Sequence, residues 1–257
     1  MALTSCKEQL SDGYHLMWRF APLYIRLMLR CLLWFLPAIF VFALFAIFNT
    51  RVGIGVDGSF YLFLSVVNYV LMVLGFVCMI VAMIKGMQFY ASVFKAVEAA
   101  HKAGDKKVSS KEVWASSKGY FWRLGFVYLL FSLCIMAGIL AFVVPAVILG
   151  IWFCFAYFFA VLRDKPVIES FKYSKGIAKG NFWYIFWRWI VVFLVSLAAV
   201  IVITLPQPML DNPDLPLLIV ILYMILAFAV EVLLTSFTFS FWYIFFLDLE
   251  KELPKSS

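Results

Sequence analysis

The stretch IESFKYSKGIAKGNFWYIFWRWIVVFLV, residues Ile168 to Val195, decides the fold because it joins two kinds of sequence without a break. It begins with mixed charged and apolar residues, passes through a cluster of aromatic residues around Arg188, and ends as continuous apolar sequence. An amphipathic helix with a lysine-rich face lies in the plane of a membrane interface, whereas about 20 apolar residues in a row span a bilayer. We therefore interpret the stretch as an elbow, a surface helix that turns into a membrane span.

The composition of the whole chain favours a membrane protein. Hydrophobic residues make up 66% of the 257 residues and charged residues 14%, whereas soluble domains have about 45–50% and about 25%. Six unbroken apolar runs are long enough to span a bilayer, which predicts an all-α integral membrane fold of six transmembrane helices in three hairpins. We expect one polytopic domain over residues 1–257. The six runs are Leu29–Phe48, Tyr61–Ile84, Leu124–Val143, Val144–Leu162, Trp189–Leu205 and Leu217–Leu247.

The basic residues predict the orientation of the six spans. Of the 21 lysines and arginines, all but Arg51 lie before the first span, in the second-to-third and fourth-to-fifth connections, or after the sixth span. The remaining connections hold Arg51 together with Asp57, Asp211 and Asp214. Because cytoplasmic loops are enriched in basic residues, we predict that both termini are cytoplasmic. The net charge of +7 then favours a bilayer with anionic headgroups as partner, rather than nucleic acid.

The elbow pattern occurs three times. Before the third span, Lys111–Leu130 also contains Ser-Lys-Gly, Phe-Trp and Arg, and Ser11–Leu36 is a fainter copy before the first span. We predict three tandem units over residues 11–103, 109–163 and 164–250, each an amphipathic interfacial elbow helix followed by a two-span hairpin. Asp164 is the expected N-cap of the last elbow and Gly180 its expected stop. The expected interfacial anchors are Trp18, Arg19, Trp122, Arg123, Trp183, Trp187 and Arg188.

Residues Val143–Trp183 carry a recognisable pattern. Pro and Gly lie early in the fourth span, an acid follows it, and then come a Ser, a Lys-Gly pair and an aromatic residue: Pro145, Gly150, Asp164, Ser174, Lys179-Gly180 and Trp183. This pattern resembles that of bacterial six-span inner-membrane proteins, including the YciC-type proteins and the membrane domain attached to some glycerophosphodiester phosphodiesterases. The resemblance implies a multi-pass fold in the cell inner membrane. The ending with Asp248 is similar too, although Glu250 stands where that group has a basic residue.

Two polar residues inside the predicted spans are candidate sites. Glu231 lies well inside the sixth span, and an ionisable residue at that depth is a functional-site hypothesis. It either couples a proton or substrate, or it is a neutral acid bonded to a neighbouring helix, for example to Asn68 or Ser236. Asn68 in the second span is an interhelical contact or a ligand-binding residue.

The sequence offers little material for catalysis or for metal binding. The only histidines are His15 and His101, and the five cysteines show no paired spacing. No phosphate-binding loop, serine-hydrolase or zinc-protease spacing occurs, so we expect no enzyme activity, no cofactor and no metal. The leading hypothesis is a non-catalytic protein of membrane homeostasis or assembly, with a membrane-protein partner or as a homo-oligomer. The alternative is a small transporter or lipid-handling permease that uses Glu231.

Overall fold

The computed structural model describes residues 5–52, 58–104, 106–206 and 216–251. In this part of the chain all regular structure is helical, and six helical segments are long and apolar enough to cross a membrane. This confirms the predicted all-α class and the six candidate spans. The elements are α1 (Cys6–Val52), α2 (Gly58–Ala103), α3 (Ser110–Ser116), the short 3₁₀ helix η1 (Lys118–Tyr120), α4 (Phe121–Ala141), α5 (Val143–Phe153), α6 (Ala156–Leu162), α7 (Val167–Thr204) and α9 (Leu217–Glu250).

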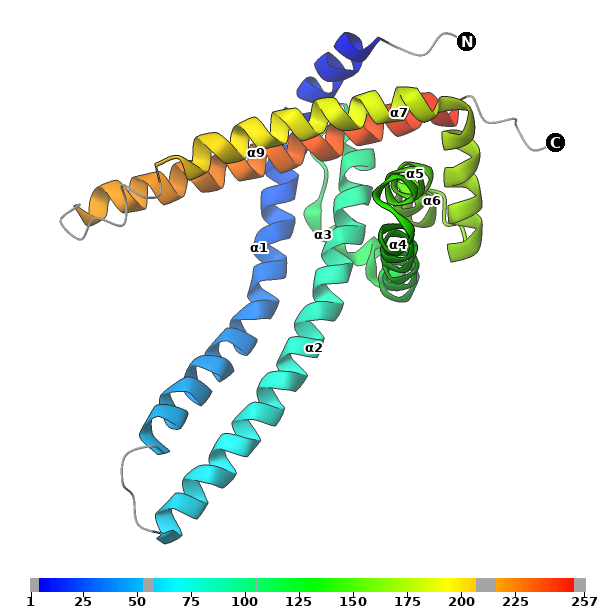
Figure 1. The fold of residues 1–257 in the computed structure, drawn as a ribbon. Helices are drawn as coiled ribbons and strands as arrows, with labels where there is room; N and C mark the ends of the chain where they lie inside the picture. Colours follow the sequence, from blue (N-terminus) through cyan, green and yellow to red (C-terminus); the bar gives the residue numbers. More distant parts are fainter. Residues whose placement is uncertain (1–4, 53–57, 105, 207–215, 252–257) are drawn as a thin grey trace.

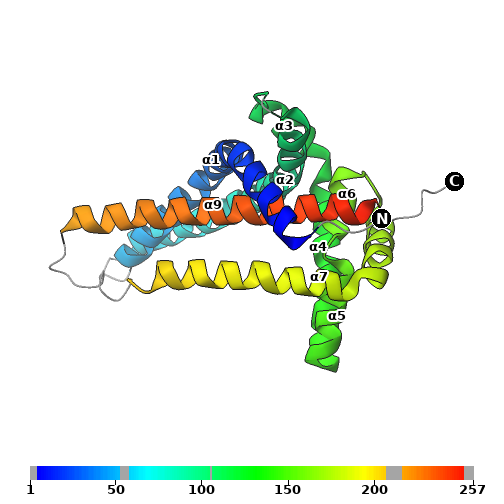
Figure 2. The same ribbon diagram turned by 90° about the horizontal axis from the view of Figure 1, so that it is seen from above.

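The helices form three pairs that leave one common region in three directions. Figure 1 shows α1 and α2 running downward together and α7 and α9 running to the left, while α4 and α5 are seen nearly end-on. In Figure 2 the α4–α5 pair extends away from both of the others. We call these pairs the first, second and third arm in chain order. The region where they meet, built from the start of α1, the end of α2, α6, the first half of α7 and the end of α9, is the hub.

The hub holds most of the buried core. Aromatic rings from α6 and α9 fill it, and the rings of Phe158 and Phe246 stack with 5.1 Å between their centroids. Phe155 contacts both Phe245 and Phe246 from the junction between α5 and α6. Apolar burial of this kind is the main favourable term in folding. The hub is therefore the part of the molecule that fixes how the three arms are joined.

The arms are much less buried than the hub. In the most apolar 18-residue window of each span, between 6% and 22% of the residues are buried, except in Val143–Leu162, where the share is 39%. The arms therefore leave many apolar side chains facing outward. Such surfaces need lipid or a partner helix around them, because water does not solvate them.

The segment Ile168–Val195 bends where its composition changes. Helix α7 has non-helical backbone angles at Asn181, with φ −120° and ψ 22°. Before the bend, Phe171, Ile177 and Ala178 are buried whereas Lys172 is exposed, as expected for an amphipathic segment. The N-cap is Pro166 and not Asp164, so the predicted cap is wrong. Placement of this segment in the membrane interface stays a prediction.

The other two predicted elbows differ from it and from each other. The second is a separate short helix, α3, with Ser109 at its N-cap position but without a side-chain capping bond. The first is not separated from its span, because α1 is continuous and includes Pro22 and Pro37. A proline interrupts one helical hydrogen bond without always ending a helix. The predicted unit boundaries near residues 109 and 164 fall between arms, and the internal repeat itself stays a prediction.

Candidate functional site

The predicted tryptophan anchors are exposed, whereas the predicted arginine anchors range from the exposed Arg19 to the buried Arg188. Trp18, Trp122, Trp183 and Trp187 are exposed. Arg188, however, is only 5% exposed, which corrects the expectation that it reaches toward lipid phosphate. Successive residues of an α-helix point about 100° apart, so Arg188 can lie against a neighbouring element although Trp187 before it faces outward.

Arg188 joins the start of the first arm to the end of the third. Its Nε donates to Gln9 Oε1 at 2.6 Å, and Gln9 Nε2 donates to Asp248 Oδ2 at 2.8 Å. The guanidinium also lies over the Tyr184 ring, 3.2 Å from its centroid. Gln9 is fully buried, and a buried amide is stable only when its polar atoms are bonded. This chain of contacts therefore fixes α1, α7 and α9 relative to one another.

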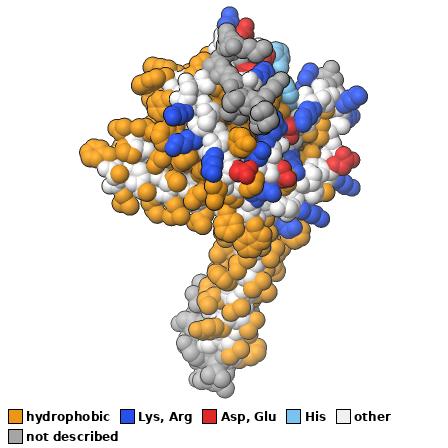
Figure 3. Space-filling view, turned by 90° about the vertical axis from the view of Figure 1, so that its right-hand side faces the viewer, with side chains coloured by type: hydrophobic (Ala, Val, Ile, Leu, Met, Phe, Trp, Pro, Cys, Tyr) orange, Lys and Arg blue, Asp and Glu red, His pale blue; other side chains and the backbone are white. Residues whose placement is uncertain are grey.

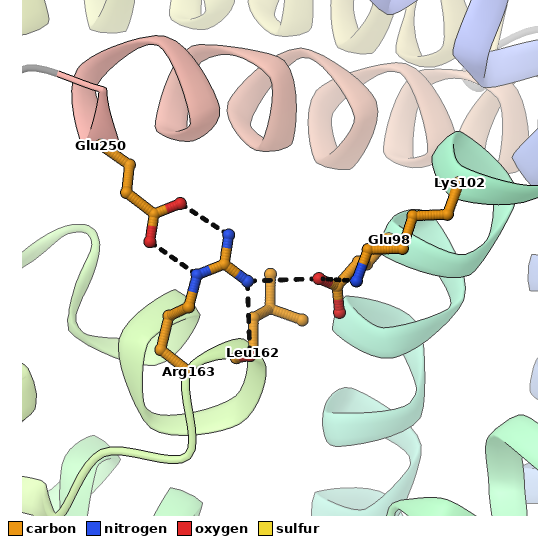
Figure 4. Close-up of polar contacts among 5 residues, drawn as sticks. All are labelled: Glu98, Lys102, Leu162, Arg163 and Glu250. Atoms are coloured by element: carbon orange, nitrogen blue, oxygen red, sulfur yellow. Dashed lines mark hydrogen bonds and ion pairs between the residues drawn. The ribbon is translucent and has the colours of Figure 1, made fainter.

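Arg163 joins three helix ends (Figure 4). Its Nε and Nη2 donate to the two carboxylate oxygens of Glu250, both at 2.6 Å, and its Nη1 lies 3.2 Å from Glu98 Oε1. Lys102 contacts the same Glu98 oxygen at 2.7 Å. The hydrogen bonds to Glu250 raise the pKa of Arg163, so this guanidinium is charged at every physiological pH. A two-point contact between Arg and carboxylate fixes orientation as well as distance.

A third polar contact holds the second arm to the start of α7. The Arg123 guanidinium and the Tyr120 hydroxyl both donate to Asp164 Oδ1. These bonds, that from Arg123 first, hold the pKa of the Asp164 carboxyl below its ordinary value of 3.8. Asp164 has a φ of +54°, a region that Asp tolerates better than most residues. Its role is therefore to receive Arg123 across the turn, and not to cap α7.

Ser174 supports the interruption between α5 and α6, which the sequence analysis treats as one unbroken span. Its hydroxyl donates to the Trp152 carbonyl at 2.7 Å and accepts from the Phe155 N–H at 3.2 Å. Backbone N–H and C=O groups at such an interruption lose their helical hydrogen-bond partners. A buried backbone group without a hydrogen bond costs folding free energy. The hydroxyl supplies the partners, so Ser174 is a structural residue.

The two intramembrane candidates lie on different arms. Glu231 lines an open groove of about 460 Å³ between α7 and α9, together with Thr204 and Tyr223. Asn68 lies on the first arm, in the first quarter of α2. The Tyr223 hydroxyl donates to the Ile203 carbonyl across the groove. The Ser236 hydroxyl has no hydrogen-bond partner among the described residues, and both interpretations of Glu231 stay predictions.

The described residues offer no metal cluster and no disulfide. Among the described residues no group of three His, Cys, Asp or Glu side chains is close enough together to hold a metal ion. All five cysteines are free. Cys31 is buried and the other four are partly buried.

Comparison with known proteins places the chain in a family. A family model described as "Domain of unknown function (DUF7847)" matches residues 57–249, about three quarters of the chain. The chain belongs to the DUF7847 family. The matched region runs from the start of α2 almost to the end of α9 and contains Glu98, Arg163, Arg188 and Asp248. No curated protein and no solved structure matches.

The sequence analysis missed the residues that carry most of the hub contacts. Gln9 and Arg163 were given no role, and Glu250 was noted only as a departure from the pattern. One feature of the sequence indicated that Arg163 and Glu250 could meet. Arg163 directly follows the fourth apolar run and Glu250 follows the sixth, so both were expected on the cytoplasmic side. Nothing in the sequence pointed to Gln9, because its contact with Arg188 joins residues 179 positions apart.

Proposed function

We propose that this DUF7847 protein is a non-catalytic, multi-pass protein of the cell inner membrane that contributes to membrane homeostasis or assembly. Its three arms would contact helices of other membrane proteins or of further copies of the chain. The hub would hold the arms in place from the cytoplasmic side. The absence of recognised catalytic motifs in the sequence supports a non-catalytic role, and the resemblance to six-span inner-membrane proteins supports the location.

The observation that carries the proposal is the low burial of the separate arms. A six-helix protein that works alone as a transporter packs its helices around a pathway, with its site between them. Here the third-arm helix Leu217–Glu250 has only 6% of its apolar window buried, and the three arms leave the hub in different directions. Apolar side chains along every arm are thus available to helices of other molecules.

The distribution of charge supports the proposed orientation. Figure 3 shows Lys and Arg side chains gathered over the hub, whereas the arm below it is almost wholly hydrophobic. Gln9, near the start of α1, and Asp248, near the end of α9, contact each other in the hub. Both described ends of the chain therefore lie at the basic end, which fits two cytoplasmic termini under the positive-inside rule.

Some residues of the pattern shared with the six-span inner-membrane proteins make contacts that join the helices of this protein. Asp164, Ser174 and Asp248 belong to the pattern shared with the six-span inner-membrane proteins, and each bonds a side chain or backbone group in the hub. These three residues of the shared sequence pattern thus help to hold helices together. A relationship between DUF7847 and those groups is part of the proposal.

Native mass spectrometry of the protein extracted in its own lipids tests the assembly role. Helix α4 presents exposed residues at alternating spacings of three and four, including Leu129 and Leu133, a spacing suited to a partner helix. We expect a stoichiometric protein partner or a homo-oligomer that weakens in the L129A/L133A variant. The matched control L130A/I139A removes two large aliphatic side chains elsewhere on the exposed surface of α4 and should retain it. The proposal would be overturned if native mass spectrometry found only a monomer and cross-linking in the native membrane found no partner and no second copy.

The groove beside Glu231 favours one alternative, a lipid-handling permease. The groove is open, mostly apolar and lined by a carboxyl group at membrane depth, which suits a hydrophobic substrate with one polar group. In that case the purified protein would retain a lipid or small molecule that the Glu231→Gln variant loses at unchanged expression. Retention by the variant, or lower expression alone, would count against this alternative.

A further inference from the structure

A basic depression on the hub stands apart from the contacts described so far. It lies between α1 and the turn that follows α2 and has a volume of about 330 Å³. Four cationic residues line it: Arg19 and Arg26 from α1, and Lys106 and Lys107 from the turn. We call it the basic pocket. Pockets of a few hundred Å³ are the usual size for small ligands.

The local backbone explains why four cations meet there. Arg19 and Arg26 are seven residues apart, so they lie on one face of α1 two turns from each other. Gly104 ends α2 with a φ of +58°, a conformation that glycine adopts without strain. The turn is closed by the Lys106 N–H, which donates to the Ala103 carbonyl at 3.1 Å. This reversal brings Lys106 and Lys107 to the side of α2 that faces α1.

The charge of the pocket is strongly one-sided. No Asp or Glu lines it among the residues that the structure describes. Arg26, Lys106 and Lys107 make no ion pair within that same part of the chain, in contrast to Arg123 and Arg163. The sequence places one carboxylate, Asp105, between Gly104 and Lys106, outside the described residues. The four cations that line the pocket give it a positive charge that favours a multiply charged anion.

The floor of the pocket is apolar and its edge is aromatic. Leu23 and Ala100 are almost fully buried beneath it, whereas Trp18 at the edge is 53% exposed. Guanidinium groups bind phosphate oxygens in pairs and lysines act as point charges beside them. An apolar floor next to such cations accommodates a ligand that is part anion and part hydrocarbon.

We propose that the basic pocket binds a phosphomonoester group. Such a group carries about −1.5 to −2 charges at neutral pH, which matches a net cationic pocket better than the single charge of a phosphodiester. Arg26 lies three residues before Leu29, where the first apolar run begins, so a lipid headgroup is within reach of one end of the pocket. Arg19 lies farther from that run, on the side open to soluble phosphorylated compounds. This binding goes beyond the proposed assembly role and does not depend on it.

The test compares two charge-matched variants of the full chain in detergent. Lys106 and Lys107 are replaced by Gln in one variant, and Lys111 and Lys172 in the other. The control lysines are exposed, outside the pocket and without ion pairs in the described structure. Binding of dioctanoyl phosphatidic acid is measured by native mass spectrometry and by thermal shift. We expect a roughly tenfold loss of affinity in K106Q/K107Q and less than about a twofold loss in the control.

Further probes separate the two sources of the phosphate. Glycerol 3-phosphate offers the same phosphomonoester without acyl chains, and dioctanoyl phosphatidylcholine offers acyl chains with a zwitterionic head. Much tighter binding of phosphatidic acid than of glycerol 3-phosphate assigns the pocket to a lipid, whereas equal binding assigns it to a soluble ligand. Equal losses in the two lysine variants, or equal binding of phosphatidylcholine, would overturn the proposal.

Discussion

At the scale of single residues, Arg163 has the largest predicted effect on stability. The R163A variant removes a charged hydrogen-bonding group and leaves Glu98 and Glu250 without their shared partner. We expect a loss of about 1.5–3 kcal/mol in the free energy of unfolding, measured by thermal unfolding in detergent. The control K102A removes only the outer, exposed contact of the same cluster and should cost less than about 1 kcal/mol. Equal effects of the two variants would contradict the assignment.

The contact between Arg123 and Asp164 gives a prediction about pH. The folded state lowers the pKa of Asp164, so this contact stabilises the fold above the unfolded pKa and its contribution is lost as pH falls through the folded pKa. The wild type should therefore unfold at a higher temperature than D164N between pH 5 and 8. The difference should shrink as the pH falls below about 4. A difference that stays constant down to pH 2.5 would show that Asp164 acts through its backbone conformation instead.

Sequence reasoning at this scale identified residue types better than their partners. The Trp–Arg pairs were predicted to act together at the headgroup level, yet Arg188 is buried against Gln9 and Tyr184. The local pattern defines which side of a helix a residue occupies, but not which distant element lies there. Such contacts join residues far apart in the chain, and one sequence by itself contains no information on that pairing.

At the scale of elements, the close approach of α4 and α5 depends on Gly138. A Cβ placed there would lie 2.7 Å from the Ala146 Cα and 2.8 Å from its N, both backbone atoms. G138A should therefore push the two helices apart and cost about 1–3 kcal/mol. In the matched control G125A, on the same helix, the new methyl group meets nothing within 4 Å, and the variant should be neutral or more stable. Thermal unfolding of both variants distinguishes packing from helix propensity.

The positions of the helices could be predicted from the sequence better than the positions of their bends and interruptions. The six apolar runs are largely helical because the bilayer length and the need for internal backbone bonds leave few alternatives. The turn from surface helix to span was placed at Gly180, and the backbone departs from helical geometry one residue later, at Asn181. The interruption between α5 and α6 was not predicted, because it depends on Ser174 from another helix.

At the scale of the whole molecule, the directions of the three arms limit how the protein can be arranged in a membrane. Three arms that extend in different directions cannot all be perpendicular to one flat hydrocarbon layer about 30 Å thick. If all six helices span, the arms have to rotate toward one another about the hub. Spin labels at Phe63, Leu140 and Leu205, near the ends of the three arms, should therefore show shorter distances in bilayers than in detergent. Unchanged distances would mean that at least one arm does not span.

The hub also has a consequence for how the protein is made. Arg163 and Arg188 are synthesised in the middle of the chain, whereas Asp248 and Glu250, which complete their contacts, belong to the end of α9. Because translation proceeds from the amino terminus, Gln9 and Glu98 are already made when the two arginines appear, whereas Asp248 and Glu250 follow only with the sixth span. The insertion machinery therefore handles the first two arms with the hub half assembled, and the contacts of α9 complete it last.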